Sequence, residues 1–395
     1  MLKQQNNPEH DNIRPFPQKV GTYVDDPLWG HVHIRDQEDN NNPEPNLQGK
    51  YCFHPWDWLE VLPNGRVFMC CATWLPFEIG NILDQPFDEL WNGEKAQAIR
   101  ESIVDGSYKY CQKKLCPLIQ SNHLEDMNNV KDERKSLIAD FPMHVNFSCD
   151  ESCNLSCPSC RVKKIQFNEG PEYDKRKRIN DLLWENILQA SKTKNFIHVH
   201  ITGSGDPWGS KIFREKLWDL DLREYPNIAM NFKTNGVMLT EKTWNKMWRI
   251  HDRVRALGVS WDACHETTYN VTRRDGDYQQ LRKNMKFMND VAASFPKLKL
   301  HFDYVVQTYN YREIPDFVEM MCNDYPNSRQ VMFTLVSDWG TWTPDVYKWN
   351  AIWKDTHPQY EDLLKVLASV PKSRDSKINW ANMKGIVDIA RTRYA

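Results

Sequence analysis

The sequence of 395 residues has no stretch that approaches the roughly 20 consecutive apolar residues of a membrane span. Its first residues, Met1-Leu2-Lys3-Gln4-Gln5, lack the apolar core of a signal peptide. An excess of one charge is also missing, since the formal net charge is only −2. This balance gives no electrostatic footprint for nucleic acid or for an anionic membrane. We therefore expect a cytoplasmic protein in a reducing compartment, long enough for a full core and a second domain.

Eleven cysteines stand out against these absences. In a reducing compartment they favour metal ligation over disulfides. Five of them lie within residues 52–116 and four within residues 149–160, while Cys264 and Cys322 stand apart. The clustering predicts two metal-binding segments.

The second segment contains the run Cys153-Asn-Leu-Ser-Cys157-Pro-Ser-Cys160. Three thiolates at this spacing can bind three irons of a cubane cluster and leave the fourth iron open for a small molecule, whereas electron-transfer clusters are normally closed by four thiolates. Cys149 stands four residues earlier, so a closed four-cysteine cluster or a structural zinc site is the alternative. In the three-cysteine interpretation, Cys149 is a buried strand residue or a thiol near the cluster.

Strand-like and amphipathic helical runs alternate after Phe141. The strand-like runs are Met143–Ser148, Phe196–Thr202, Ile228–Lys233, Val254–Trp261, Leu298–Val306 and Gln330–Val336. Helical runs lie near 175–194, 211–218, 241–250, 278–294 and 311–323. Six βα units in succession predict an α/β fold, a parallel sheet with helices outside it, two units short of a closed TIM barrel. Ligands of such sheets bind at the C-terminal ends of the strands, and the cysteine loop follows the first of them.

A strand followed by CxxxCxxC, with Pro158 and Arg161 behind, resembles the cluster loop of the radical S-adenosylmethionine (SAM) superfamily. The resemblance implies a partial (βα)6 barrel and a [4Fe–4S] cluster whose open iron binds the amino and carboxylate groups of SAM. It also implies cleavage of SAM to a 5′-deoxyadenosyl radical, which abstracts a hydrogen atom from a substrate. The electron would come from a reduced flavodoxin or ferredoxin.

The segments after the other strands match further family features and give candidate SAM-binding residues. The turn after the second strand resembles the family's Gly-Gly-Glu-Pro segment, with Ser204 and Asp206 as departures. Two glycines allow a close approach of the backbone to a ligand. The candidates are Gly203, Ser204, Gly205, Asp206, Pro207, Thr234, Asn235, Ser260, Asp262, Arg274 and Gln307.

Two of these assignments, and the role of Cys264, have alternatives. Thr234 and Asn235 also fit a plain Asn-Gly turn. Arg274 is preferred over Arg273 as the fork that pairs with the SAM carboxylate. Cys264 follows the fourth strand, where a thiol could return a hydrogen atom to a substrate radical, although a small buried residue is the plainer interpretation.

The first cysteine segment resembles the SPASM or "twitch" module, which carries an auxiliary [4Fe–4S] cluster in many radical SAM enzymes. Pro63-Asn64-Gly65 predicts a hairpin between Trp58–Leu62 and Arg66–Cys70, and a helical run follows over Phe87–Val104. The module precedes the predicted barrel here, whereas in the family it usually follows. The features that match are Cys52, Pro55-Trp56, Gly65, Cys70-Cys71, Gly80-Asn81, Leu90-Trp91, Arg100, Cys111 and Cys116-Pro117.

The resemblance implies that one auxiliary cluster is held by Cys52, Cys70, Cys111 and Cys116, with Cys71 as the alternate for Cys70. A zinc site built from the same four thiolates is the alternative. Thus we expect an extended or partly disordered arm over 1–49, a SPASM-like module over 50–120, a linker over 121–140, a radical SAM core over 141–340 and a helical extension over 341–395.

The predicted activity is that of a radical SAM enzyme. A peptide or protein is the preferred substrate, because SPASM-bearing members often modify such chains. A sugar or aminoglycoside-like small molecule, epimerised or dehydrogenated, is the second candidate. A non-catalytic iron–sulfur electron carrier or a zinc-stabilised binding protein is the alternative from another class. Nucleic acid and membrane are not expected as partners.

Overall fold

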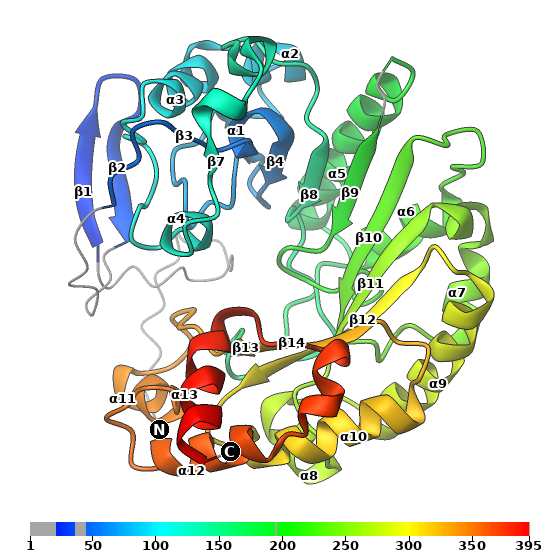
Figure 1. Cartoon of the computed structure of the whole chain (residues 1–395). Helices are drawn as coiled ribbons and strands as arrows, with labels where there is room; N and C mark the ends of the chain where they lie inside the picture. The colour runs from blue at the N-terminus through cyan, green and yellow to red at the C-terminus, as the bar shows by residue number, and fades with distance from the viewer. Residues whose placement is uncertain (1–20, 36–44, 194–195, 395) are drawn as a thin grey trace.

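The computed structural model describes residues 21–35, 45–193 and 196–394, and Figure 1 shows a curved layer of strands with helices along its outer side. One sheet has the strand order β14-β13-β12-β11-β10-β9-β8-β4-β5-β6. Its members from β8 to β14 pair in parallel. These strands are β8 (His144–Phe147), β9 (Ile197–Ile201), β10 (Ile228–Thr234), β11 (Val254–Ser260), β12 (Lys299–Val306), β13 (Gln330–Leu335) and β14 (Ile378–Asn379). The predicted α/β fold with a parallel sheet is therefore confirmed.

Helices connect successive strands and cover the outer face of the sheet (Figure 1). They are α5 (Pro171–Ala190), α6 (Lys211–Asp219), α7 (Glu241–Lys246), α8 (Glu266–Thr272), α9 (Tyr278–Ser294) and α10 (Ile314–Asp324). Side-chain oxygens fix three of the helix starts, because Ser210, Thr240 and Asp277 each accept a backbone N–H bond from the first turn. None of the helices in the described residues is long and apolar enough to cross a membrane.

The two faces of the sheet differ in chemistry because strand side chains alternate. Val145 and Phe147 of β8 are fully buried on the helix side, where the Phe147 ring lies 5.4 Å from that of Trp184. The alternate residues of the strand, His144 and Asn146, lie on the inner face and are partly exposed. The outer face is thus the hydrophobic core, and the inner face is polar.

The cysteine-rich segment continues the same sheet. Its strands are β4 (Trp58–Val61), β5 (Arg66–Phe68) and β6 (Gly80–Asn81). β4 and β5 form the predicted antiparallel hairpin, while the other edge of β4 pairs in parallel with β8. Short elements complete the segment: α1 (His54–Asp57), α2 (Phe87–Trp91), α3 (Glu94–Val104), α4 (Pro117–Gln120), and the pair β3 (Lys50–Tyr51) and β7 (Glu125–Asp126).

Two expectations for the terminal segments meet different outcomes. The arm predicted over 1–49 contains a hairpin of β1 (Gly21–Asp26) and β2 (Gly30–Arg35), so an extended form is wrong there, and residues 1–20 and 36–44 lie outside the described residues. Trp29 anchors this hairpin by packing against Phe77. The C-terminal extension is mostly helical as predicted, with α11 (Pro344–Asn350), α12 (Tyr360–Ser369) and α13 (Lys384–Tyr394).

Candidate metal centres

The loop after β8 carries the three predicted thiols. Cys153 and Cys157 are buried and Cys160 is partly buried. A tight turn links two of them, because the backbone N–H of Cys160 donates to the carbonyl of Cys157 at 2.9 Å. Burial raises the pKa of Cys153 to about 12, so an unmetallated thiol here is protonated, and metal ligation would deprotonate it.

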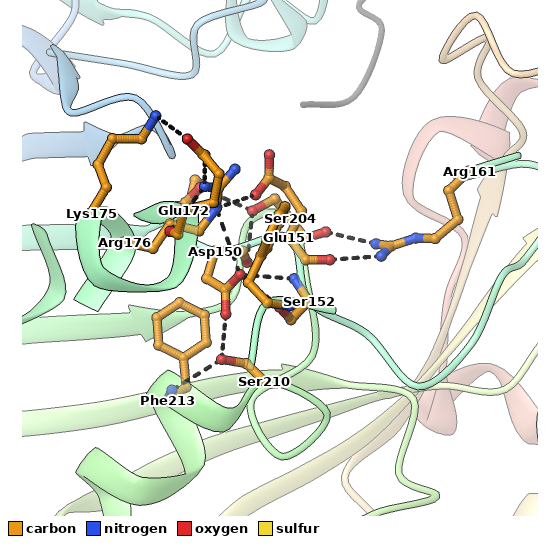
Figure 2. A network of polar contacts seen from close by, with 12 residues as sticks. Asp150, Glu151, Ser152, Arg161, Glu172, Lys175, Arg176, Ser204, Ser210 and Phe213 are labelled. Carbon is orange, nitrogen blue, oxygen red and sulfur yellow. Dashed lines mark hydrogen bonds and ion pairs between the residues drawn. The ribbon is translucent and has the colours of Figure 1, made fainter. Parts of the chain in front are cut away.

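One arginine, Arg161, lies beside the cysteine loop. The guanidinium of Arg161 lies 3.6 Å from the Cys160 sulfur and donates to the carbonyls of Glu151 and Ser204 at 2.7 and 2.8 Å, as Figure 2 shows for the two carbonyls. Burial lowers the pKa of Arg161, but the thiols of Cys160, Cys153 and Cys157 outweigh it and raise the pKa overall. The Arg161 charge therefore lies beside Cys160 and acts on the thiols of the loop.

The fourth cysteine of this segment, Cys149, differs in burial. Its side chain is fully buried, whereas Cys153 and Cys157 are each 7% exposed. Burial raises its pKa well above the usual value, and the charged groups that act on it are Asp150, Glu151 and Arg176. No contact between Cys149 and the other three thiols is recorded among the described residues, and the charged groups that act on it are those of the loop start and α5.

A buried charge network holds the start of the loop (Figure 2). Asp150 accepts hydrogen bonds from the backbone N–H of Ser152 at 3.0 Å and from the Ser210 hydroxyl at 2.5 Å. Arg176 of α5 donates to Glu151 at 3.0 Å and also pairs with Glu172. Burial raises the pKa of both loop carboxyl groups, and these donors oppose the shift. The network joins the loop to the first turns of α5 and α6.

The predicted glycine-rich turn packs directly on the cysteine loop. A Cβ at Gly203 would lie 1.8 Å from the Ser148 hydroxyl oxygen, and one at Gly205 would lie 2.6 Å from the carbonyl oxygens of Asp150 and Ser152. No larger side chain fits at either position without a shift of the loop. The Ser204 hydroxyl donates to the Ser148 carbonyl at 3.0 Å, and Pro207 beyond it is buried.

Asp206 ties this turn to the end of β10. One carboxylate oxygen accepts the backbone N–H bonds of Trp208 and Gly209 at 3.0 and 2.9 Å. The other accepts from the Thr234 hydroxyl at 2.7 Å and from the Asn235 backbone at 2.8 Å. The Asn235 amide in turn lies 3.6 Å from the Cys153 sulfur. Two predicted SAM-binding segments therefore meet at a cysteine of the loop.

The two SAM-binding candidates at the end of β11 have different surroundings. Ser260 lies opposite Asp303 in the parallel register with β12. Asp262 has a positive φ of 62° and is buried, with an ion pair of 2.6 Å to Arg273. Burial raises the pKa of Asp262, while Arg273 opposes that shift.

The two neighbouring arginines differ in position. Arg273 is partly buried and lies 3.8 Å from the Cys157 sulfur. Arg274, which the sequence favoured, instead donates to the Ser156 hydroxyl at 2.9 Å and to the Val162 carbonyl at 3.1 Å. Arg273 therefore contacts a predicted ligand, whereas Arg274 fixes the loop backbone.

Gln307 follows β12 and is buried, and its side-chain amide nitrogen has no hydrogen-bond partner among the described residues. A buried donor left unpaired is costly, which indicates a group that the protein binds here. The neighbouring Asn310 donates to the Asp262 carbonyl at 2.9 Å, so this segment adjoins the arginine and aspartate near Cys157.

Cys264 is placed among the helices. Its backbone N–H donates to Glu313 at 2.7 Å. Burial raises the pKa of its thiol to about 11, and Glu313, Asp316, Arg282 and Asp324 are the charged groups that act on it. These groups belong to α9, α10 and the turn before α10, so the structure does not bring Cys264 to the three thiols.

The four predicted auxiliary ligands line one small cavity in the N-terminal segment. Its walls are Cys52, His54, Pro55, Cys70, Trp74, Leu75, Tyr108, Cys111, Cys116 and Ile119. Burial raises the pKa of Cys52 to about 12 and those of Cys70 and Cys111 well above the usual value. Cys71 does not line the cavity, which agrees with the preference for Cys70.

Both sets of thiols fit an iron–sulfur cluster. Among the described residues, no three histidine, cysteine, aspartate or glutamate side chains lie close enough to hold a single metal ion. The donors are instead spread over a loop and around a cavity, and thiolates are the usual ligands of multi-iron clusters. The thiolate donors suit an iron–sulfur cluster, and the four thiolates around the cavity would also suit zinc.

The inner face of β4, β8 and β9 carries an aromatic group that sequence reasoning missed. His144 and His200 approach within 3.0 Å through their ring nitrogens, and Trp58 lies beside both rings. His198 stacks on His144. The sequence could have revealed this group, because residues two apart in a strand lie on the same face. His144 and Asn146 share one face of β8, and His198 and His200 share one face of β9.

We expect these histidines to make the fold sensitive to acid. Burial, and then neighbouring histidines, lower the pKa of His144 to about 4 and that of His200 to about 3, from 6.5. The unfolded chain therefore binds protons first, so stability is full above pH 6.5 and is lost as pH falls toward 4. After allowance for partial solvation, the loss is about 1–2 kcal/mol.

Urea unfolding of the apoprotein at about pH 7 and about pH 5 measures this loss. His200→Asn should reduce the difference between the two midpoints, whereas His123→Asn at an exposed position should leave it unchanged. Equal pH dependence in wild type and His200→Asn would contradict the assignment.

Comparison with known proteins gives one family match. Residues 52–117 match the family model SPASM, described as an iron–sulfur cluster-binding domain. No curated protein sequence matches the chain. A similar solved structure is described as "Native anSMEcpe with bound AdoMet", with 16% sequence identity and a TM-score of 0.35. The match covers 48% of this chain and 50% of that chain, so this chain spans about half the length of the protein it matches. This match over residues 52–117 confirms the SPASM-like iron–sulfur module that the sequence predicted.

Proposed function

We propose that the chain is a radical SAM enzyme whose cluster is held by Cys153, Cys157 and Cys160. The observations that carry this proposal are the three-cysteine loop at the end of β8 and the polar groups that contact its sulfurs: Arg161 lies 3.6 Å from Cys160, the Asn235 amide lies 3.6 Å from Cys153, and Arg273 lies 3.8 Å from Cys157. Three thiolates leave one iron of a [4Fe–4S] cluster open, which is what a chelated substrate requires and an electron carrier does not. When bound, the cluster supplies the electron for cleavage of SAM to methionine and a 5′-deoxyadenosyl radical.

The residues around the loop would hold SAM. Its site would be formed by the turn Gly203–Pro207, by Thr234 and Asn235, by Ser260 and Asp262, and by Gln307. Contact with Cys157 favours Arg273 over Arg274 as the arginine nearest the cofactor. The unpaired amide of Gln307 is a hydrogen-bond donor ready for a ligand acceptor.

We assign the curved parallel sheet of residues 141–340 as the partial (βα)6 core and residues 341–395 as its helical extension. The SPASM domain would hold one auxiliary [4Fe–4S] cluster through Cys52, Cys70, Cys111 and Cys116. β4 of this domain pairs in parallel with β8 of the core, so one continuous sheet joins the two segments that carry the proposed ligands. A closed cluster there would carry electrons, with flavodoxin or ferredoxin as the external donor.

The proposed substrate is a peptide or protein. The polar inner face also favours a second candidate, a sugar or aminoglycoside-like molecule. Besides the histidines it offers Lys233 of β10, which reaches across Gly258 of β11 to pair with Asp303 of β12. These groups can donate and accept hydrogen bonds to hydroxyl or amine groups. The placement of Cys264 among helices favours dehydrogenation over an epimerisation that needs this thiol as hydrogen donor.

Release of 5′-deoxyadenosine tests the proposal. We expect the anaerobically reconstituted, dithionite-reduced protein to form 5′-deoxyadenosine and methionine from SAM, measured by liquid chromatography and mass spectrometry. Protein with a full complement of iron that binds no SAM and releases neither product would contradict the proposal. An electron carrier would then be the better assignment.

A further inference from the structure

Glu60 lies where the SPASM domain and the parallel sheet join. In β4 it is paired with Phe68 of β5 on one side and with Asn146 of β8 on the other. Its strand neighbours Leu59 and Val61 are fully buried on the helix side, so the Glu60 side chain lies on the inner face. That side chain is itself buried, with the residue 7% exposed.

The carboxylate of Glu60 has a different partner at each oxygen. One oxygen accepts hydrogen bonds from the Ser148 hydroxyl at 2.6 Å and from the Asn146 amide at 3.0 Å. The other accepts from the backbone N–H of Ala72 at 3.2 Å. Glu60 thus connects two segments that are far apart in the sequence.

Each partner leads directly to one of the metal centres. Ala72 follows the pair Cys70-Cys71, and Cys70 lines the auxiliary cavity. On the other side, the Ser148 hydroxyl lies beneath Gly203, where it occupies the place of a side chain.

We propose that Glu60 is a positioning residue that couples the two centres. Its first oxygen fixes the Ser148 and Asn146 side chains that support the Gly203–Ser204 turn of the SAM site. Its second oxygen fixes the backbone after Cys70 and places a negative charge beside the auxiliary ligands. This inference rests on the proposed function, because it assigns the turn to SAM binding.

The chemistry requires an ionised glutamate. All three partners donate hydrogen bonds, so both oxygens must accept. A glutamine would direct its NH₂ group at one set of donors, and the hydrogen bonds to that set would be lost. An aspartate is one methylene shorter and cannot keep both sets at these distances.

The experiment compares Glu60→Gln and Ser148→Ala with wild type, each reconstituted to full iron content. Equilibrium dialysis gives the SAM dissociation constant, and an electron paramagnetic resonance redox titration gives the midpoint potential of the auxiliary cluster. For Glu60→Gln we expect SAM binding to weaken about tenfold. We also expect the auxiliary potential to rise, because loss of a nearby negative charge stabilises the reduced cluster.

Ser148→Ala separates the two effects. It removes the hydroxyl below Gly203 but leaves the Glu60 charge and its bond to Ala72 in place. SAM binding should weaken while the auxiliary potential stays unchanged. Glu78→Gln is the matched control, since Glu78 lies in the same domain and pairs with the surface residue Arg66; both readouts should equal those of wild type.

The outcomes distinguish this inference from the proposed function. Unchanged SAM affinity and potential in Glu60→Gln, with a wild type that binds SAM, would overturn the coupling. A wild type that holds both clusters but binds no SAM would overturn the proposed function. A shift of potential in Glu60→Gln would then support only the contact with the auxiliary centre and would refute the coupling to SAM.

Discussion

Cys153→Ala protein is expected to release 5′-deoxyadenosine only at background level while it keeps the auxiliary cluster. In the proposed site Cys153 contributes one of three thiolates, and its sulfur contacts the Asn235 amide, so its removal would eliminate both a ligand and the contact to the proposed SAM-binding segment. Two thiolates do not hold a cubane firmly, because each of the other irons then depends on external ligands. About half of the iron should be lost if each centre holds one [4Fe–4S] cluster. Iron and sulfide analysis together with chromatographic detection of 5′-deoxyadenosine gives both readouts.

The matched control is Cys149→Ala. This thiol belongs to the same segment but is fully buried. Its loss should cost about 1 kcal/mol of stability through a small cavity and leave iron content and product formation unchanged. Loss of activity in both variants with equal loss of iron would indicate a closed four-cysteine cluster and contradict the open-iron assignment.

The order and bounds of the strands and helices could be predicted well from the sequence, because they depend on local residue patterns. Strand β10 was expected over Ile228–Lys233 and spans Ile228–Thr234, and helix α9 was expected over 278–294 and spans Tyr278–Ser294. Buried parallel strands are short apolar runs, and amphipathic helices have a 3.6-residue period, so each is visible in a short window. The helical run over Phe87–Val104 was less accurate, since Asn92 and Gly93 divide it into two helices.

Long-range pairing could not be predicted in the same way. The hairpin of β4 and β5 was visible from its Pro-Asn-Gly turn, but the pairing of β4 with β8 joins segments that no local pattern connects. The environment of Glu60 depends wholly on that pairing, which is why the sequence did not identify this residue. The hairpin at 21–35 was missed because polar, proline-bearing sequence surrounds it.

The candidate site was predicted where its residues are fixed by motif spacing. The turn that contains Gly203 and Gly205 packs on residues 148–152 at the start of the cysteine loop, next to the predicted ligands, as the motif order implied. The choice between Arg273 and Arg274 depends instead on the backbone of the α8 C-terminus. Adjacent residues there point in different directions, and one residue of register decides which arginine reaches Cys157.

Asp206→Asn is expected to lower the free energy of unfolding and to weaken SAM binding strongly. Four donors converge on this buried carboxylate, two from the backbone after the turn and two from the end of β10. An asparagine must place its NH₂ group against one pair of donors, which leaves those donors unpaired and drives the two segments apart. We expect a cost of about 2–4 kcal/mol in the free energy of unfolding. Urea unfolding of the apoprotein measures it, with the exposed Asp219→Asn as the control that should stay at the wild-type midpoint.

Asp206→Glu separates the effect of charge from that of geometry. Glutamate keeps the negative charge, and the family segment that this turn resembles has glutamate here. In this chain, however, all four donors lie within 2.7 to 3.0 Å of the shorter side chain, which is 1% exposed. A Cβ at Gly209 would already lie 3.2 Å from the Asp206 Cβ, so an added methylene finds no room. We therefore expect Asp206→Glu to weaken SAM binding as well. Wild-type affinity in Asp206→Glu together with weak binding in Asp206→Asn would show that charge alone matters, and the aspartate would then hold the SAM site through its field and not by joining β9 to β10.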